Sequence, residues 1–125
     1  MPREGLNCLG LTPPVGPFSH LVKAREFLYL SGQVAQDPVT GKLIEGDATA
    51  QTTQIFANLR VALKTAGRDL QHVVKVTVFL TDMLDFAGMN AVYAGQFAPP
   101  YPARTTIAVK ALPLGALVEI ECIAQ

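Results

Sequence analysis

Four side chains near the carboxyl end of the chain have the types and spacing of a site that binds a small carboxylate. Arg104 and Thr106 stand two residues apart in one run, and Glu119 and Glu121 do so in the next. Residues two apart in a β-strand point to the same side. A guanidinium can hold a carboxylate through two parallel hydrogen bonds. These residues therefore predict a site for a small carboxylate substrate.

The element expected to position them is a β-hairpin over residues 102–124, with its turn at residues 112–115, where proline and glycine interrupt the alternation. Its apolar rows are expected to share one core. That arrangement predicts that all four polar side chains emerge together on the second face of the sheet. The alternative for Arg104 and Glu119 is an ordinary cross-strand ion pair, which contributes only about 0.2–1 kcal/mol.

The rest of the chain alternates strand and helix signals. The predicted elements are a hairpin over residues 20–31, a helix over 48–66 after the N-cap Asp47, a strand over 72–80, and a helix over 86–97 capped by Asp82 or Asp85. Residues 1–15 are expected to be irregular, apart from a short strand near residues 7–9.

The order β-β-α-β-α-β-β predicts an α+β fold, with two helices on one face of a mixed sheet and a single domain over residues 1–125. In the strand of residues 72–80, Val74, Val76 and Val78 are expected to face the helices. Lys75 and Thr77 are expected on the other face, which no part of the chain covers. Solvent or another copy of the chain must cover that face.

The composition limits the possible partners. Half of the 125 residues are hydrophobic, 16% are charged, the net charge is zero and the pI is about 6.7. The apolar surplus predicts a subunit interface, while the neutral charge argues against nucleic acid and membrane surfaces as partners. No run reaches the ~18 apolar residues of a membrane span and no signal peptide is recognisable, so a cytoplasmic location is expected.

The two cysteines have no metal-ligand spacing, and no metal site is expected. Cys122 lies in an apolar row and is expected to pack as a small hydrophobic residue. A disulfide between Cys8 and Cys122 remains an alternative, although nothing marks the chain as secreted.

Short motifs from Val15 to Ala124 resemble, in order and spacing, the RidA/YjgF family of reactive intermediate deaminases. They include Gly16-Pro17-Phe18-Ser19, Ser31-Gly32-Gln33, Asn90-x-x-Tyr93, Pro102-Ala103-Arg104 and Val118-Glu119-Ile120-Glu121. The resemblance implies a chorismate-mutase-like α+β fold and a homotrimer around a central β-barrel, with clefts between neighbouring subunits. It also implies hydrolysis of 2-imino or 2-enamino acids to 2-oxo acids and ammonia, without metal or cofactor.

The resemblance gives individual residues a role. Arg104 corresponds to the arginine that binds the substrate carboxylate, and Glu119 to the carboxylate that positions or activates the water. Gly32 and Asn90 match positions that line the family's pocket, and Ser31 adjoins them. Burial would raise the pKa of Glu119 and a nearby Arg104 would lower it, and the sequence leaves that balance open.

Two positions depart from the family pattern. Phe18 stands where a tyrosine is usual, and Thr106 where a cysteine is frequent. Both are assigned to the substrate-binding site, with plain packing as the alternative. These departures keep open a catalytically weak relative that binds small carboxylates or acts in stress. A ribonuclease or translation inhibitor is a third hypothesis, against which the neutral charge and the lack of a basic-aromatic strip speak.

Overall fold

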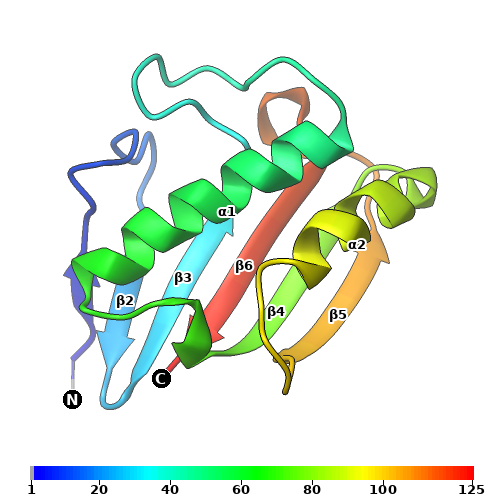
Figure 1. Cartoon of the computed structure of the whole chain (residues 1–125). Coiled ribbons are helices and arrows are strands. Elements are labelled where there is room, and N and C mark those ends of the chain that lie inside the picture. Colours follow the sequence, from blue (N-terminus) through cyan, green and yellow to red (C-terminus); the bar gives the residue numbers. More distant parts are fainter. Residues whose placement is uncertain (1) are drawn as a thin grey trace.

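The structure is a computed structural model that describes residues 2–125 as a six-stranded mixed sheet with two α-helices across one face (Figure 1). The strand order is β1-β2-β3-β6-β4-β5, in which β4 and β5 are parallel and the other neighbours antiparallel. The predicted α+β class is confirmed. The strands are β1 (Glu4–Leu6), β2 (Leu21–Ala24), β3 (Phe27–Gln33), β4 (Val73–Leu80), β5 (Ala103–Ala108) and β6 (Val118–Ala124); the helices are α1 (Ala48–Thr65) and α2 (Phe86–Ala94), with short 3₁₀ turns η1 (Leu70–His72), η2 (Met83–Asp85) and η3 (Pro113–Gly115).

The predicted hairpin at the carboxyl end is wrong, because β4 lies between β5 and β6. Alternate residues of β4, among them Val76 and Val78, are fully buried, and a central position gives this strand ladder partners on both sides. The segment from β5 to β6 passes over the end of β4, where the Val109 N–H donates to the Leu80 carbonyl at 2.7 Å. The pairing of both β5 and β6 with β4, and not with each other, sets the face of the sheet that each predicted site residue occupies.

The helix boundaries follow local signals in the sequence. The Asp47 carboxylate accepts a hydrogen bond from the Ala50 N–H at 2.9 Å, so it caps α1 as predicted. Gly67 follows that helix with a φ of +71°, a left-handed conformation that glycine adopts without strain. Asp82, one of the two predicted caps, accepts from the Leu84 N–H at 2.9 Å and so caps the η2 turn that leads into α2. α2 ends before the predicted residue 97.

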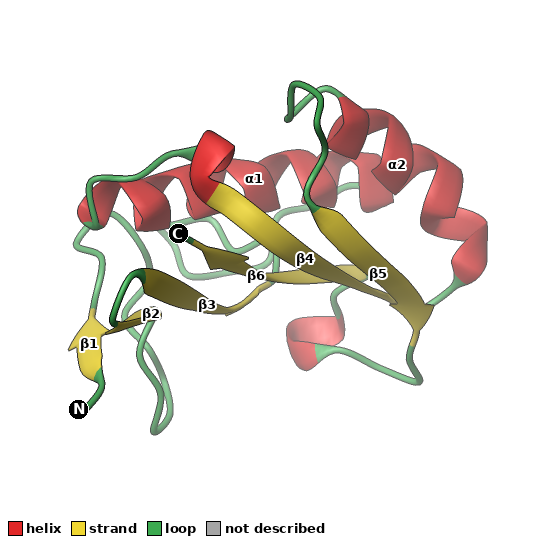
Figure 2. Cartoon of the chain, turned by 90° about the horizontal axis from the view of Figure 1, so that it is seen from below, coloured by secondary structure: helices red, strands yellow, loops and turns green. Residues whose placement is uncertain are grey.

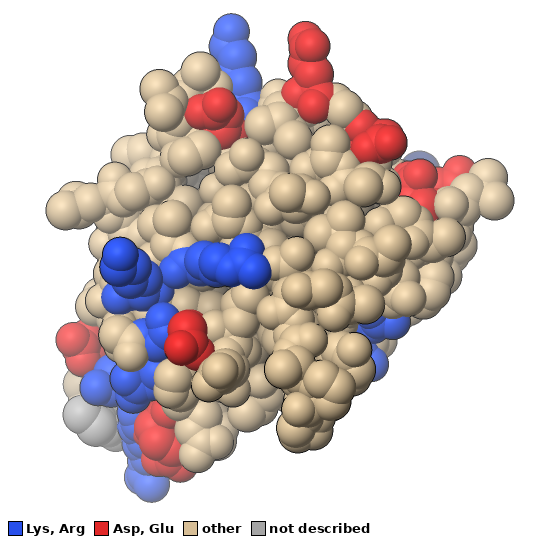
Figure 3. Space-filling view, viewed as in Figure 1, with Lys and Arg blue, Asp and Glu red and all other residues tan. Residues whose placement is uncertain are grey.

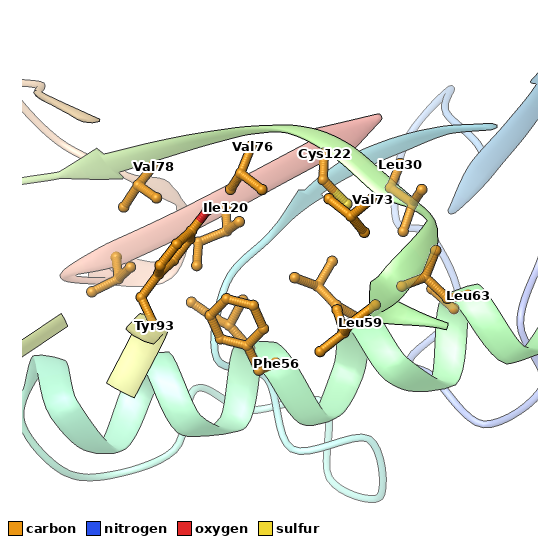
Figure 4. Packing of buried hydrophobic residues seen from close by; sticks show 14 of the residues in the cluster. Leu30, Phe56, Leu59, Leu63, Val73, Val76, Val78, Tyr93, Ile120 and Cys122 are labelled. Carbon is orange, nitrogen blue, oxygen red and sulfur yellow. The ribbon is translucent and has the colours of Figure 1, made fainter. Parts of the chain in front are cut away.

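The core fills the space between the helices and the sheet (Figure 4). Phe56 of α1 packs edge-on against Tyr93 of α2, with ring centroids 5.8 Å apart, and both lie against Ile120 and Val76 of the sheet. Each large apolar side chain buried here contributes about 1.5–3 kcal/mol. Cys122 is buried in this core as predicted, and it is a free thiol like Cys8, so the disulfide alternative is not present.

Within residues 2–125 the opposite face of the sheet carries no α-helix, and Figure 2 shows α1 and α2 on one side of the sheet. Tyr29 and Ile107 lie on this open face and are 46% and 42% exposed. Partly buried residues of β4 accompany them, as predicted for Lys75 and Thr77.

Two sequence expectations about strands need correction. Val73, not Val74, enters the core at the start of β4, because the register with β6 shifts between Val73 and Lys75 and leaves Val74 40% exposed. The first strand is β1, a few residues earlier than the predicted residues 7–9, since it pairs with β2.

Candidate functional site

The predicted site residues divide between the two faces of the sheet. Arg104 pairs with Val76 in the parallel ladder, and Val76 is buried beneath the helices. Glu119 pairs with Phe79, on the open face. Directly opposite residues in a ladder point to the same side, so the prediction that Arg104 and Thr106 share a face with Glu119 is wrong. The alternation of β5 defines two rows of side chains, and its polar row turns towards α2 while Ile107 faces outward.

Helix α2 holds the guanidinium of Arg104. The Arg104 Nη1 donates to the Asn90 Oδ1 at 2.8 Å. The guanidinium carbon lies 4.5 Å from the ring centroid of Tyr93 and 5.6 Å from that of Phe86. These cation–π contacts and the amide fix the plane of the guanidinium, which carries five N–H donors in all. Asn90 is its one hydrogen-bond partner within residues 2–125, so further donors are available to an anion.

Two hydroxyls near this arginine lie buried without a partner in the described part of the chain. They are the Oγ1 of Thr106 and the phenol oxygen of Tyr93. A buried hydroxyl that lacks a hydrogen bond costs about 1–3 kcal/mol, so each is expected to find a partner in a ligand, a water or another copy. Burial raises the pKa of Tyr93, and the charge of Arg104 opposes that shift. We refer to Arg104, Asn90 and Thr106 as the arginine cluster, in which guanidinium donors and a buried hydroxyl have no partner among residues 2–125.

A second group of predicted residues lines a cleft of about 230 Å³. Phe18, Gly32 and Glu119 contribute to its wall, together with residues 11–15 and the η3 turn. Burial raises the pKa of the Glu119 carboxyl, and the negative charge of Glu121 raises it further. Within one chain, burial and not Arg104 determines the direction of the Glu119 pKa shift, because Arg104 lies on the other face of the sheet. We refer to this group as the carboxylate cleft.

Gly32 permits the close approach of strand β3 to this carboxylate. A Cβ atom at Gly32 would lie 2.5 Å from the Glu119 Oε2, so any other residue would displace the carboxylate. Ser31, by contrast, is not among the residues that line the cleft, and its hydroxyl donates to the Ser19 carbonyl at 2.7 Å. The structure gives Ser31 a positioning contact between β3 and the segment that carries Phe18.

His20 is a structural residue that the sequence pattern did not reveal. Its Nδ1 accepts a hydrogen bond from the Cys8 N–H at 2.8 Å, so the ring hydrogen sits on Nε2, which donates to the Thr12 carbonyl at 2.8 Å. The imidazole is 4% exposed and lines the carboxylate cleft. It therefore fastens the N-terminal segment that forms one wall. A lone histidine before a strand carries no sequence signal for this role.

Residues 2–125 hold no group of three or more His, Cys, Asp or Glu side chains placed to bind a metal ion. Over the same residues, every helix is too short or too polar to cross a membrane.

The chain is thus an α+β protein in which the arginine cluster lies beside α2 and Glu119 of the carboxylate cleft lies on the open face of the sheet. Residues 10–125 match the family model described as Endoribonuclease L-PSP. The chain is 48% identical to a RutC family protein of Pyrococcus horikoshii, over 89% of this chain and 88% of the relative. It is 44% identical to the 2-iminobutanoate/2-iminopropanoate deaminase of Mus musculus, over 98% of this chain and 90% of the relative.

A solved structure agrees with these matches. The YjgF gene product of E. coli superposes with a TM-score of 0.90 at 32% identity, and the match covers 97% of each chain. The chain belongs to the RidA/YjgF family of reactive intermediate deaminases.

Proposed function

We propose that the protein is a hydrolytic deaminase that converts 2-imino and 2-enamino acids to 2-oxo acids and ammonia. The observation that carries this proposal is Arg104, whose guanidinium is fixed by α2 while part of its donor set stays free. A guanidinium that is fixed in place and has free N–H donors can bind a carboxylate through two parallel hydrogen bonds. The partly buried Glu119 supplies a group for water activation. The name of the mouse relative supports the same chemistry.

In this proposal, each active site combines the arginine cluster of one copy of the chain with the carboxylate cleft of another copy. Arg104 and Glu119 lie on opposite faces of one sheet, so a single chain does not present both to one substrate. Arg104 stands on the edge strand β5, and Glu119 stands on a face that leaves Tyr29 exposed. A contact that joins these two different surfaces is heterologous, and three such contacts close into a ring. The homotrimer implied by the family resemblance has this symmetry.

In the proposed reaction, Arg104 of one copy holds the substrate carboxylate, and Asn90 keeps the guanidinium in place. Glu119 of the next copy orients a water and accepts a proton as the water oxygen bonds to the imine carbon. That proton passes to the nitrogen and gives a carbinolamine. The hydroxyl of the carbinolamine then loses its proton, by way of Glu119, to the same nitrogen as the carbon–nitrogen bond breaks, so that ammonia leaves and the 2-oxo acid forms. A 2-enamino acid reaches the same imine when a proton moves from nitrogen to carbon. Phe18 supplies an apolar wall, and Thr106 a hydroxyl beside Arg104.

A catalytically weak carboxylate-binding protein is the alternative that Phe18 and Thr106 keep open.

Ribonuclease activity has less support in the structure, despite the description of the matching family model. On the helix side of the molecule, acidic side chains lie among the basic ones at the lower left, and no continuous basic strip crosses the surface (Figure 3). The net charge of the chain is zero. A backbone-binding nuclease requires a positively charged track.

The test supplies unstable imines at the point of use. An amino-acid oxidase generates 2-iminopropanoate or 2-iminobutanoate, semicarbazide captures the imine that is not yet hydrolysed, and ammonia and 2-oxo acid are followed over time. A deaminase present in catalytic amounts lowers the captured fraction and speeds ammonia release. Unchanged rates, together with measurable binding of pyruvate, would instead establish the carboxylate-binding alternative.

Glu121 offers a test of the state of Glu119 by pH. The Glu121 charge raises the pKa of Glu119, so Glu121→Gln lowers that pKa and keeps Glu119 ionised to lower pH. We expect the acid limb of kcat/KM to move to lower pH in this variant, while the plateau at neutral pH stays within about twofold of wild type. An acid limb that stays in place or moves to higher pH would contradict the assignment of this limb to Glu119.

A further inference from the structure

Leu114, in the η3 turn, adopts a backbone conformation that leucine disfavours. Its φ is +61° and its ψ is +15°, and Arg25 is the other non-glycine residue with a positive φ among residues 2–125. In this left-handed region the β-carbon crowds the following carbonyl, and glycine or asparagine is the usual occupant. The Leu114 residue is 59% exposed, so burial does not compensate for the strain. Folding alone gives no reason for leucine here.

The place of Leu114 supplies that reason. Its side chain lines the carboxylate cleft together with Phe18 and Glu119. Pro14 and Val15 extend the same apolar lining, and Val15 is itself 91% exposed. The cleft, at about 230 Å³, is smaller than the roughly 300–1,000 Å³ of sites for drug-sized ligands. It suits a small acid whose tail is apolar.

We propose that Leu114 determines substrate specificity by contacting the side chain of the imino acid, and that the protein favours 2-imino acids with long or branched aliphatic side chains over 2-iminopropanoate. The inference rests on the proposed function, because it takes the carboxylate cleft as one half of that site. With the carboxylate on Arg104 of a neighbouring copy and the imine carbon near Glu119, the substituent on that carbon points to the apolar wall. A methyl group would leave Leu114 and Phe18 in water, whereas a branched chain covers them.

The decisive variant is Leu114→Gly, which removes the apolar contact and also relieves the strained φ. We expect kcat/KM for 2-imino-4-methylpentanoate to fall about tenfold, and that for 2-iminopropanoate to change by less than about twofold. The Tm is expected to stay the same or rise, because glycine accepts this conformation. A lower kcat/KM for 2-imino-4-methylpentanoate with an unchanged or higher Tm would show that Leu114 acts in substrate recognition and not in folding.

Matched controls isolate the contact from the backbone effect. Arg25→Gly relieves a positive φ of +56° at the tip between β2 and β3, away from the cleft, and is expected to leave the ratio of the two rates unchanged. Leu114→Met keeps an apolar side chain and is expected to keep the wild-type preference within about threefold. Leu114→Asn fits the left-handed backbone but is polar, so it is expected to lose the preference.

Product binding gives a second readout that does not need turnover. Isothermal calorimetry with 4-methyl-2-oxopentanoate and with pyruvate is expected to show tighter binding of the former to wild type, and a difference reduced about tenfold in Leu114→Gly. An equal change for both ligands, or no change, would overturn the role of Leu114 while leaving the deaminase proposal intact. Failure of wild type to hydrolyse either imine would instead reject the deaminase, and the calorimetric ratio would still decide whether Leu114 reads the side chain.

Discussion

Replacing Arg104 with alanine is expected to lower kcat/KM for 2-iminobutanoate by about 100- to 1,000-fold, because the substrate loses a charge-assisted, two-bond contact to its carboxylate. The guanidinium is already oriented by Asn90 at 2.8 Å and by the Tyr93 ring at 4.5 Å. Little further ordering is therefore needed when the substrate binds. Initial rates of ammonia release over a range of imine concentrations measure the effect.

Arg104→Lys serves as the matched control. Lysine keeps the positive charge but lacks the planar fork, so an intermediate loss of about tenfold is expected. Pyruvate binding measured by calorimetry is expected to weaken in the same order. Wild-type kcat/KM in Arg104→Ala, with an unchanged Tm, would show that this arginine only ties β5 to α2.

Replacing Glu119 with glutamine is expected to lower kcat by about 100-fold or more, since the amide keeps the shape of the side chain but cannot accept the proton of the water. KM and pyruvate affinity are expected to change little, because the carboxylate of the substrate is held by Arg104. Single-substrate kinetics with 2-iminobutanoate separate the two parameters. A loss in KM alone would assign Glu119 to binding and not to water activation.

The same variant carries a stability signature. Burial raises the pKa of Glu119 in the folded chain, so the protonated form is favoured there and the folded state loses stability as pH rises through that raised value. Glu119→Gln has no charge to bury, and its Tm is expected to exceed that of wild type at neutral pH. Near pH 4 the two proteins are expected to converge. A higher Tm with a lower kcat would mark a group kept for function at a cost to stability.

Local signals in the sequence predicted the elements well. The Asp47 cap, the Gly67 stop and the tip of the β2–β3 hairpin are decided by residues next to each other in the chain. Strand order is not local. The alternation of β5 and β6 defines rows of side chains, but the neighbour of each strand depends on where β4 lies, and β4 precedes both in the sequence.

That limit explains the main error in the predicted site. Arg104 and Glu119 were expected to share a face through a hairpin, and the parallel pairing of β4 with β5 places them on opposite faces. The residue types were informative even though the geometry was not. Gly32 and Phe18 lie with Glu119, and Asn90 lies with Arg104. No sequence pattern marks His20 or Leu114, because the first is distinguished by its hydrogen bonds and the second by its backbone angle.

Complementation between two inactive variants tests the central claim most directly. Arg104→Ala and Glu119→Gln chains, carrying different affinity tags, are co-expressed, and oligomers that contain both are isolated and assayed with 2-iminobutanoate. If each site takes its arginine from one copy and its carboxylate from the next, every mixed trimer keeps one intact site in three, and about a third of wild-type activity returns. Activity in the mixed oligomers no higher than in either variant alone would contradict a site shared between copies.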